Sequence, residues 1–168
     1  MRSRTAKWFE TKVRYERQQE DGSQKKVTEL YVVDALTFTE AESAITEEMA
    51  SYVSGEFGIT DIKPAAYGEI FFSDMDNDDK WYKTKLQFIT IDEKTEKEKR
   101  SNVNYLVQAK TLQSAVKHIE EVMGQTMIDY VIASINETQI MDVFEHHAPN
   151  EKRPAEPDAQ PEYEEVKA

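Results

Sequence analysis

Hydrophobic and polar residues alternate from position 8 to position 18, which is the period-2 pattern of a half-buried β-strand. The apolar residues of one face are Phe9, Val13 and Tyr15, while the other face begins with Trp8 and continues with charged residues. A turn signal at residues 20–23 separates this strand from a second one at residues 27–35, which is rich in β-branched and aromatic side chains. The two segments predict an antiparallel hairpin.

A helix is predicted directly after the hairpin. Thr37 followed by Glu40 has the spacing of a capping box, and apolar residues then recur at helical intervals up to Tyr52. The helix is expected to end near Gly55. A strand over residues 57–62 follows, and Pro64 predicts a bulge, an edge or a break because it cannot donate to a ladder. Strand character resumes at residues 67–72.

The pattern is then repeated. Residues 80–88 match residues 7–15 at an interval of 73 positions, and residues 105–109 match residues 31–35 at an interval of 74. The second copy predicts strands at 81–91 and 102–109, a helix at 112–123 that Gly124 ends, and strand material from 130 to 144. The predicted fold is therefore α+β, built from two internally duplicated β-β-α-β halves with antiparallel sheets and two helices, packed about a pseudo-twofold axis.

The expected boundaries follow from the repeat. The first half covers residues 1–72, an acidic linker covers 73–79, and the second half covers 80–147. Residues 148–168 contain four prolines, no aliphatic run and an excess of acidic residues, so this tail is expected to be disordered.

Composition narrows the functional classes. The chain has 168 residues, a net charge of −12 and no cysteine, which excludes disulfides and thiolate chemistry. No apolar run is long enough for a membrane span and no secretory signal is present, so a cytoplasmic location without membrane contact is expected. The acidic balance argues against binding duplex DNA through a broad positive field, but it leaves room for a local basic strip.

No residue pattern supports catalysis. The acidic linker has aspartates at alternate positions like a calcium loop, but Asp79 stands where that loop needs glycine and Lys85 where it needs a bidentate acid. His146 and His147 are adjacent and have no third ligand at a useful spacing. No phosphate loop or nucleophile motif occurs, so neither an enzyme, a metal nor a cofactor is expected.

The repeated strand face is the candidate site. A tryptophan beside lysine and arginine side chains is the chemistry that single-stranded nucleic acid uses, since bases stack on aromatic rings and cations meet phosphates. The candidate residues are Lys7, Trp8, Lys12, Arg14, Lys80, Trp81, Lys83 and Lys85. The alternative is that the tryptophans pack between the halves and the lysines guard a strand edge, and the pattern alone leaves both open.

Several segments carry a resemblance to a known family: Trp8-Phe9-Glu10-Thr11-Lys12-Val13, Lys26-Val27-Thr28-Glu29, Val33-Asp34-Ala35, Phe38-Thr39-Glu40-Ala41-Glu42 and Ser54-Gly55-Glu56-Phe57. With them the chain resembles a domain family of unknown function found in gut anaerobes, their phages and mobile elements, from Trp8 to Val143. The resemblance implies a small cytoplasmic accessory protein and supplies no activity or binding residue.

Two hypotheses follow. The first is a non-enzymatic accessory protein of a phage or mobile element that binds single-stranded nucleic acid. The second is a protein-interaction or nucleotide-sequestering module for counter-defence, which would use the cleft between the halves. The acidic tail could recruit a protein partner in either case. The oligomeric state is open.

Overall fold

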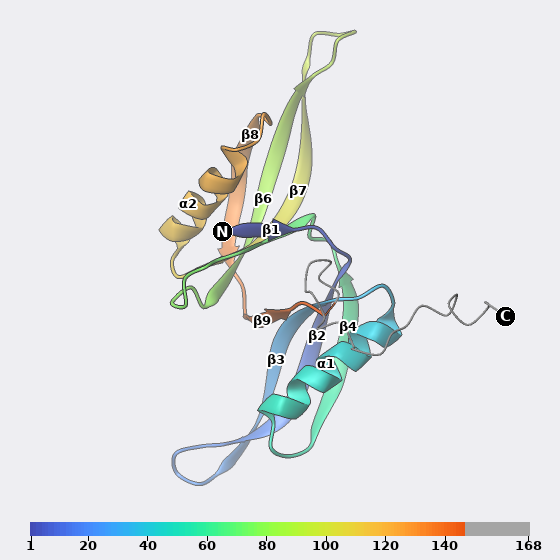
Figure 1. The fold of residues 1–168 in the computed structure, drawn as a ribbon, viewed down its shortest axis with the longest axis vertical. Helices are drawn as coiled ribbons and strands as arrows, with labels where there is room; N and C mark the ends of the chain where they lie inside the picture. The colour runs from blue at the N-terminus through green and yellow to red at the C-terminus, as the bar shows by residue number, and fades with distance from the viewer. Residues whose placement is uncertain (147–168) are drawn as a thin grey trace, which may run out of the picture.

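The computed structural model describes residues 1–146, which form two β-sheets with one helix packed on each (Figure 1). The predicted α+β class is confirmed. In chain order the elements are β1 (Arg2–Arg4), β2 (Trp8–Gln18), β3 (Gln24–Asp34), α1 (Phe38–Tyr52), β4 (Phe57–Ala65), β5 (Glu69–Phe72), β6 (Lys80–Ile91), β7 (Glu98–Ala109), α2 (Leu112–Met123), β8 (Tyr130–Glu137) and β9 (Ile140–Phe144). The predicted tail at 148–168 lies outside the described residues.

The N-cap residue of each helix is a threonine, whose side-chain oxygen accepts a backbone N–H of the first turn. Thr37 accepts the backbone N–H of Glu40 at 3.2 Å, and Thr111 accepts that of Ser114 at 3.1 Å. The predicted capping box at α1 is only half formed, because the Glu40 carboxylate accepts the N–H of Leu36 and not that of Thr37. At α2 the box is complete, with Ser114 accepting the N–H of Thr111 at 2.9 Å.

Two long hairpins form the centres of the sheets. The β2 sheet has the strand order β4-β2-β3-β9, and the β6 sheet has the order β1-β5-β7-β6-β8. Figure 1 shows the β2–β3 and β6–β7 hairpins extending to opposite ends of the molecule. Helix α1 packs on the β2 sheet and α2 on the β6 sheet, so each sheet has one helix-covered face and one helix-free face.

The halves of the chain exchange their last strands. β5, from the first half, pairs in parallel with β7 of the β6 sheet, and β9, from the second half, pairs in parallel with β3 of the β2 sheet. The prediction of purely antiparallel sheets is therefore wrong, because each exchanged strand adds a parallel pair. Residues 1–72 and 80–147 are likewise not two self-contained sheets, since each sheet includes a strand from the other half.

Equivalent residues of the two sheets pair in the same register. Ile70 lies opposite Leu106 at one exchanged strand, and Val143 lies opposite Val32 at the other. Both edge pairings also shift register at the same place, after Lys12 in β2 and after Lys85 in β6. These equivalences fit the proposed pseudo-twofold arrangement, while duplication as the origin of the halves stays a prediction.

Two segments differ from the sequence-based expectation. The first is β1, which was not expected and pairs with β5 at the edge of the β6 sheet. The second is β4, which extends past residue 62 to Ala65, while the strand edge that Pro64 predicted is confirmed. Because β4 is an edge strand that pairs only with β2, the missing N–H of Pro64 can face away from the ladder.

A central core joins the two sheets. Trp8 and Trp81 are each only 1% exposed and pack with Val32, Ile70, Leu106 and Val143, which come from both sheets. Phe72 lies between the indoles, with its ring centroid 6.4 Å from that of Trp8 and 5.7 Å from that of Trp81. The exchanged strands β5 and β9 thus carry the residues on which both tryptophans pack.

A buried ionic cluster closes one side of this core. Arg4 of β1 pairs with Asp34 at the end of β3 and with Glu145 after β9, at 3.0 Å for the second pair. Asp34 is 1% exposed and also accepts the N–H of His146 at 2.6 Å. The cluster ties the edge of the β6 sheet to two strands of the β2 sheet.

Trp81→Ala is expected to lower the free energy of unfolding by about 3–5 kcal/mol, because it empties the centre of a core that both sheets use. Urea unfolding followed by circular dichroism and by Trp8 fluorescence measures this, and the two signals should report one transition. Leu36→Ala, at a side chain that is 70% exposed, is the control and should change stability by no more than about 0.5 kcal/mol. A loss below about 1 kcal/mol, or two separate transitions, would contradict the shared core.

Asp34→Ala should lower the free energy of unfolding by about 3 kcal/mol. The substitution leaves the largely buried Arg4 with one fewer carboxylate and the N–H of His146 without its acceptor. The matched control is Asp61→Ala in edge strand β4, where the side chain is exposed. Urea midpoints for both variants make the comparison. Equal midpoints would show that the cluster does not hold the sheets together.

Candidate functional site

The helix-free face of the β2 sheet presents Lys12 and Arg14 to solvent. Both follow from strand alternation, since their neighbours Thr11 and Val13 point into the core under α1. Across the ladder they lie opposite Leu30 and Thr28 of β3. Neither cation forms an ion pair with any residue in 1–146.

The helix-free face of the β6 sheet carries Lys83, which is exposed, and Lys85, which is half-buried. Their cross-strand neighbours are uncharged: Leu106 and Asn136 lie opposite Lys83, and Asn104 and Ser134 lie opposite Lys85. Further along the face the Gln87 amide donates to Asn102 at 3.1 Å. Within residues 1–146 neither lysine is paired with a carboxylate. This face therefore combines cations with amide and hydroxyl groups.

Trp8 and Trp81 do not belong to these exposed surfaces. Both lie on the helix-free side of their strands, as expected, but at that point the other sheet covers them. A ring with 1% exposure has no free face on which a base could stack. The aromatic platform is therefore corrected to a core contact, and only the cationic part of the candidate site remains accessible.

Lys7 and Lys80 do not lie on the helix-free faces either. The Lys7 ammonium donates to the carbonyl of Leu36 at 3.1 Å and lies 5.5 Å from the ring centre of Phe9, on the helix-covered side. Lys80 pairs with Glu137 at 3.4 Å. The eight candidate residues thus divide into two in the core, two in local contacts and four on the helix-free faces.

A crevice between the sheets brings Lys83 near residues of the β2 sheet. It has a volume of about 240 Å³, and its walls include Glu10 of β2, Lys63 of β4 and Lys83 of β6. Glu10 accepts the hydroxyl of Tyr67 at 2.8 Å and lies 3.6 Å from the Lys63 ammonium. Burial and this carboxylate raise the pKa of Tyr67, so its hydroxyl stays a donor.

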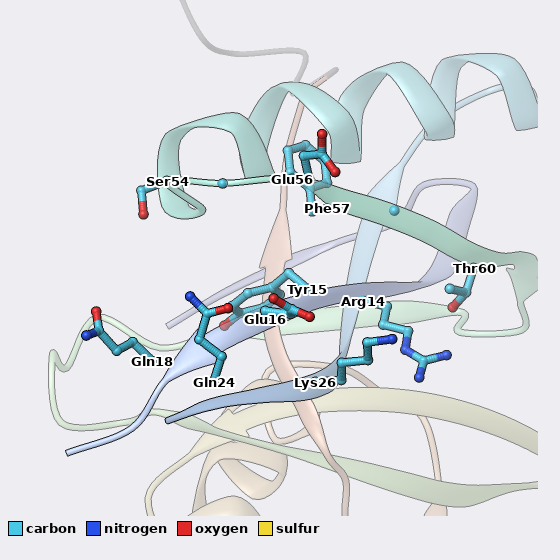
Figure 2. A pocket seen from close by; sticks show the side chains of 12 residues that line it. Arg14, Tyr15, Glu16, Gln18, Gln24, Lys26, Ser54, Glu56, Phe57 and Thr60 are labelled. Carbon is cyan, nitrogen blue, oxygen red and sulfur yellow. The ribbon is translucent and has the colours of Figure 1, made fainter. Parts of the chain in front are cut away.

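A groove larger than this crevice lies beside the end of the β2–β3 hairpin. It has a volume of about 830 Å³ and runs between the hairpin and the loop that joins α1 to β4. Figure 2 shows Arg14 and Lys26 extending from neighbouring strands on one side of the groove, with Ser54 and Phe57 on the other. Glu16 and Glu56 also line it, so its charge is mixed.

Lys26 was missed as a candidate because its neighbourhood depends on strand register. It lies opposite Glu16 and diagonal to Arg14 on the same face. Once a tight hairpin is predicted, counting residues back from the turn could have paired these positions. Only the observed register makes the pairing definite.

Other chemistry is limited within the described part of the chain. Among residues 1–146 no group of three histidine, cysteine, aspartate or glutamate side chains is arranged to hold a metal ion. No helix in the same range has the length and apolarity to cross a membrane.

The comparisons with known proteins identify the family. The model of a domain of unknown function, DUF4494, matches residues 7–146, which is most of the chain. The protein belongs to the DUF4494 family. Neither a curated protein nor a solved structure matches it. Family membership confirms the resemblance seen in the sequence but brings no activity, and an origin in gut anaerobes or their phages is not shown.

Proposed function

We propose that this DUF4494 protein is a non-enzymatic, cytoplasmic accessory protein that binds single-stranded nucleic acid through phosphate contacts on its two helix-free faces. The observation that carries the proposal is that Lys12, Arg14, Lys83 and Lys85 lie on the two helix-free faces without a carboxylate partner among residues 1–146. Other basic residues, such as Arg4, Arg17 and Lys63, already have carboxylate partners. Unpaired cations on an open sheet are free to meet an external anion.

The charge balance favours a single strand over a duplex. Outside the acidic tail the chain still has an excess of nine acidic residues, so no broad positive field surrounds the molecule. Four cations on two narrow strand faces suit a thin, flexible phosphate backbone better than a rigid double helix. With no accessible tryptophan, binding would depend on phosphates more than on base stacking, and it would therefore be sensitive to salt.

The amide-rich β6 face adds hydrogen-bond donors beside its lysines. Asn104, Asn136 and Gln87 can each donate from a side-chain amide to a phosphate or a base edge. The β2 face has fewer such groups near its cations and includes Asp61 opposite Lys12. The proposal therefore assigns the tighter contact to the β6 face.

A second candidate function is a protein-interaction module, and the edge strand β8 supports it. The edge strand β4 carries Asp61, Lys63 and Pro64, and charged residues and proline disfavour pairing with a further strand. At the equivalent positions β8 carries Ser134, Asn136 and Glu137. An edge without lysine or proline is more open to an added strand from another protein. The nucleotide-sequestering version has less support, because the crevice between the sheets is small and contains Glu10.

The test is fluorescence anisotropy with a labelled oligothymidylate at several salt concentrations. Four phosphate contacts to a single strand predict that log K falls with log salt with a slope of about −3. Lys83→Ala with Lys85→Ala should reduce that slope by about 1.4, and Lys12→Ala with Arg14→Ala should do the same with a smaller loss of affinity.

Lys110→Ala with Lys117→Ala is the matched control, since both lysines are exposed but lie before and on α2, away from the helix-free faces. The control should keep the wild-type slope. No binding at low salt, or equal slopes for all three double variants, would overturn the nucleic-acid proposal and favour the protein-interaction module.

A further inference from the structure

A third pocket lies on the helix-covered side of the β2 sheet. It has a volume of about 280 Å³, and its walls include the tyrosines Tyr15, Tyr31 and Tyr52 and the carboxylates Glu29 and Asp142. It exists because β9 pairs with β3 only from Leu30 to Val33, so the sheet is one strand narrower beside Glu29. The last turn of α1, with Met49 and Tyr52, forms the other wall.

Glu29 is a buried carboxylate whose hydrogen bonds come from the pocket itself. The hydroxyls of Tyr15 and Tyr31 donate to it at 2.7 and 2.6 Å, and the Arg17 guanidinium donates at 2.6 Å. Burial and Glu29 raise the pKa of both tyrosines, which keeps their hydroxyls as donors. One guanidinium group is therefore already held at the rim, by Glu29 and the hydroxyl of Tyr15.

Asp142, in the same pocket, has no such partner. It lies opposite Tyr31 in the parallel ladder, and its carboxylate accepts the N–H of Val143 at 2.8 Å. Within residues 1–146 no lysine, arginine or histidine pairs with it. Burial raises its pKa, and the nearby Glu48 carboxylate adds to the effect. A half-buried carboxylate without a counter-ion is destabilising in the empty pocket.

The other sheet shows that the fold does not need Glu29 or Tyr15. Glu29 lies opposite Val13, next to the register shift of β2, and at the equivalent place Val103 lies opposite Leu86 of β6. Tyr15 lies opposite Phe57, and at the equivalent place Phe88 lies opposite Tyr130. Val103 and Phe88 pack on the apolar core under α2. At these two positions the same architecture is thus built once with apolar side chains and once with polar side chains that line the pocket.

We propose that this pocket binds an organic cation, an ammonium or guanidinium group, with Asp142 as its counter-ion and the rings of Tyr31 and Tyr52 as its walls. Tyrosine rings attract cations to their faces, and Tyr52 is 66% exposed, which leaves the pocket open to solvent. The charged groups around it are Asp142, Glu29, Arg17 and the Glu48–His146 pair at 2.7 Å. Because Arg17 offsets Glu29, the charge of Asp142 is left for the ligand. The site is separate from the helix-free faces. It takes a positively charged ligand, whereas those faces are proposed to bind phosphates.

The test uses ¹H–¹⁵N NMR of the full chain, titrated with tetramethylammonium and, separately, with methylguanidinium at constant ionic strength. Saturable shifts of the Asp142 and Val143 amides are expected with at least one probe at millimolar concentration. Saturation by methylguanidinium alone would identify an arginine-like ligand, and saturation by tetramethylammonium alone a quaternary ammonium. No saturation by either probe up to about 100 mM would overturn the proposal.

Asp142→Asn keeps the shape of the side chain and removes its charge, so affinity should fall about tenfold. Glu69→Gln is the matched control, because Glu69 lies opposite Tyr105 in the β6 sheet as Asp142 lies opposite Tyr31 in the β2 sheet. It should bind like wild type, while Tyr52→Ala should weaken binding without unfolding the chain. Equal affinity in Asp142→Asn and Glu69→Gln would contradict the assignment.

The dependence on pH gives an independent check. A folded-state pKa above the unfolded value means that ionised Asp142 destabilises the folded protein, so stability contributed by this group rises as the pH falls through the folded pKa. Cation affinity should fall over the same range, because the protonated carboxyl has no charge to offer. Asp142→Asn should remove both effects without loss of stability at neutral pH. An unchanged pH profile in that variant would mean that another group holds the cation.

Discussion

The exchange of β5 and β9 between the two halves is the constraint on which the rest of the structure depends. Each sheet is completed by a strand from the other half of the chain, and both exchanged strands carry side chains that cover Trp8 and Trp81. Neither half can bury its tryptophan alone, because the covering residues Ile70 and Val143 each come from the strand that has crossed over. Folding of the halves is thereby expected to be one cooperative event.

The same constraint decides which surfaces remain for binding. The helices cover the outer face of each sheet, and the shared core covers the inner face near the tryptophans. The hairpins extend beyond this core in opposite directions, and their helix-free faces carry the exposed Lys12, Arg14 and Lys83 and the half-buried Lys85. The short pairing of β9 with β3 also leaves the gap that becomes the tyrosine pocket. Two proposed sites, one for anions and one for cations, therefore follow from one topological feature.

Local structure could be predicted from the sequence, but long-range pairing could not. Alternation placed β2, and the Thr37 cap placed the start of α1, because these signals depend on neighbouring residues. The repeat of the pattern then placed β6 and α2. The parallel pairing of β9 with β3 joins residues more than a hundred positions apart, and no local pattern specifies such a partner. Alternation also put Trp8 on the helix-free side correctly, yet only the second sheet makes that side buried at this point. Asp142 and Glu29 were missed for the same reason, since the exchange brings them together.

The most direct test of this topology, in which β5 and β9 each cross to the other sheet, is native-state amide hydrogen exchange of the protein without ligand. Amides of β5 and β9 that pair with β7 and β3 should exchange only through global unfolding, with the same free energy as the central strands β2 and β6. Fast exchange of β5 and β9, at a free energy well below that of the central strands, would show that they are loosely attached. That result would contradict an interlocked fold held by a core that both sheets share.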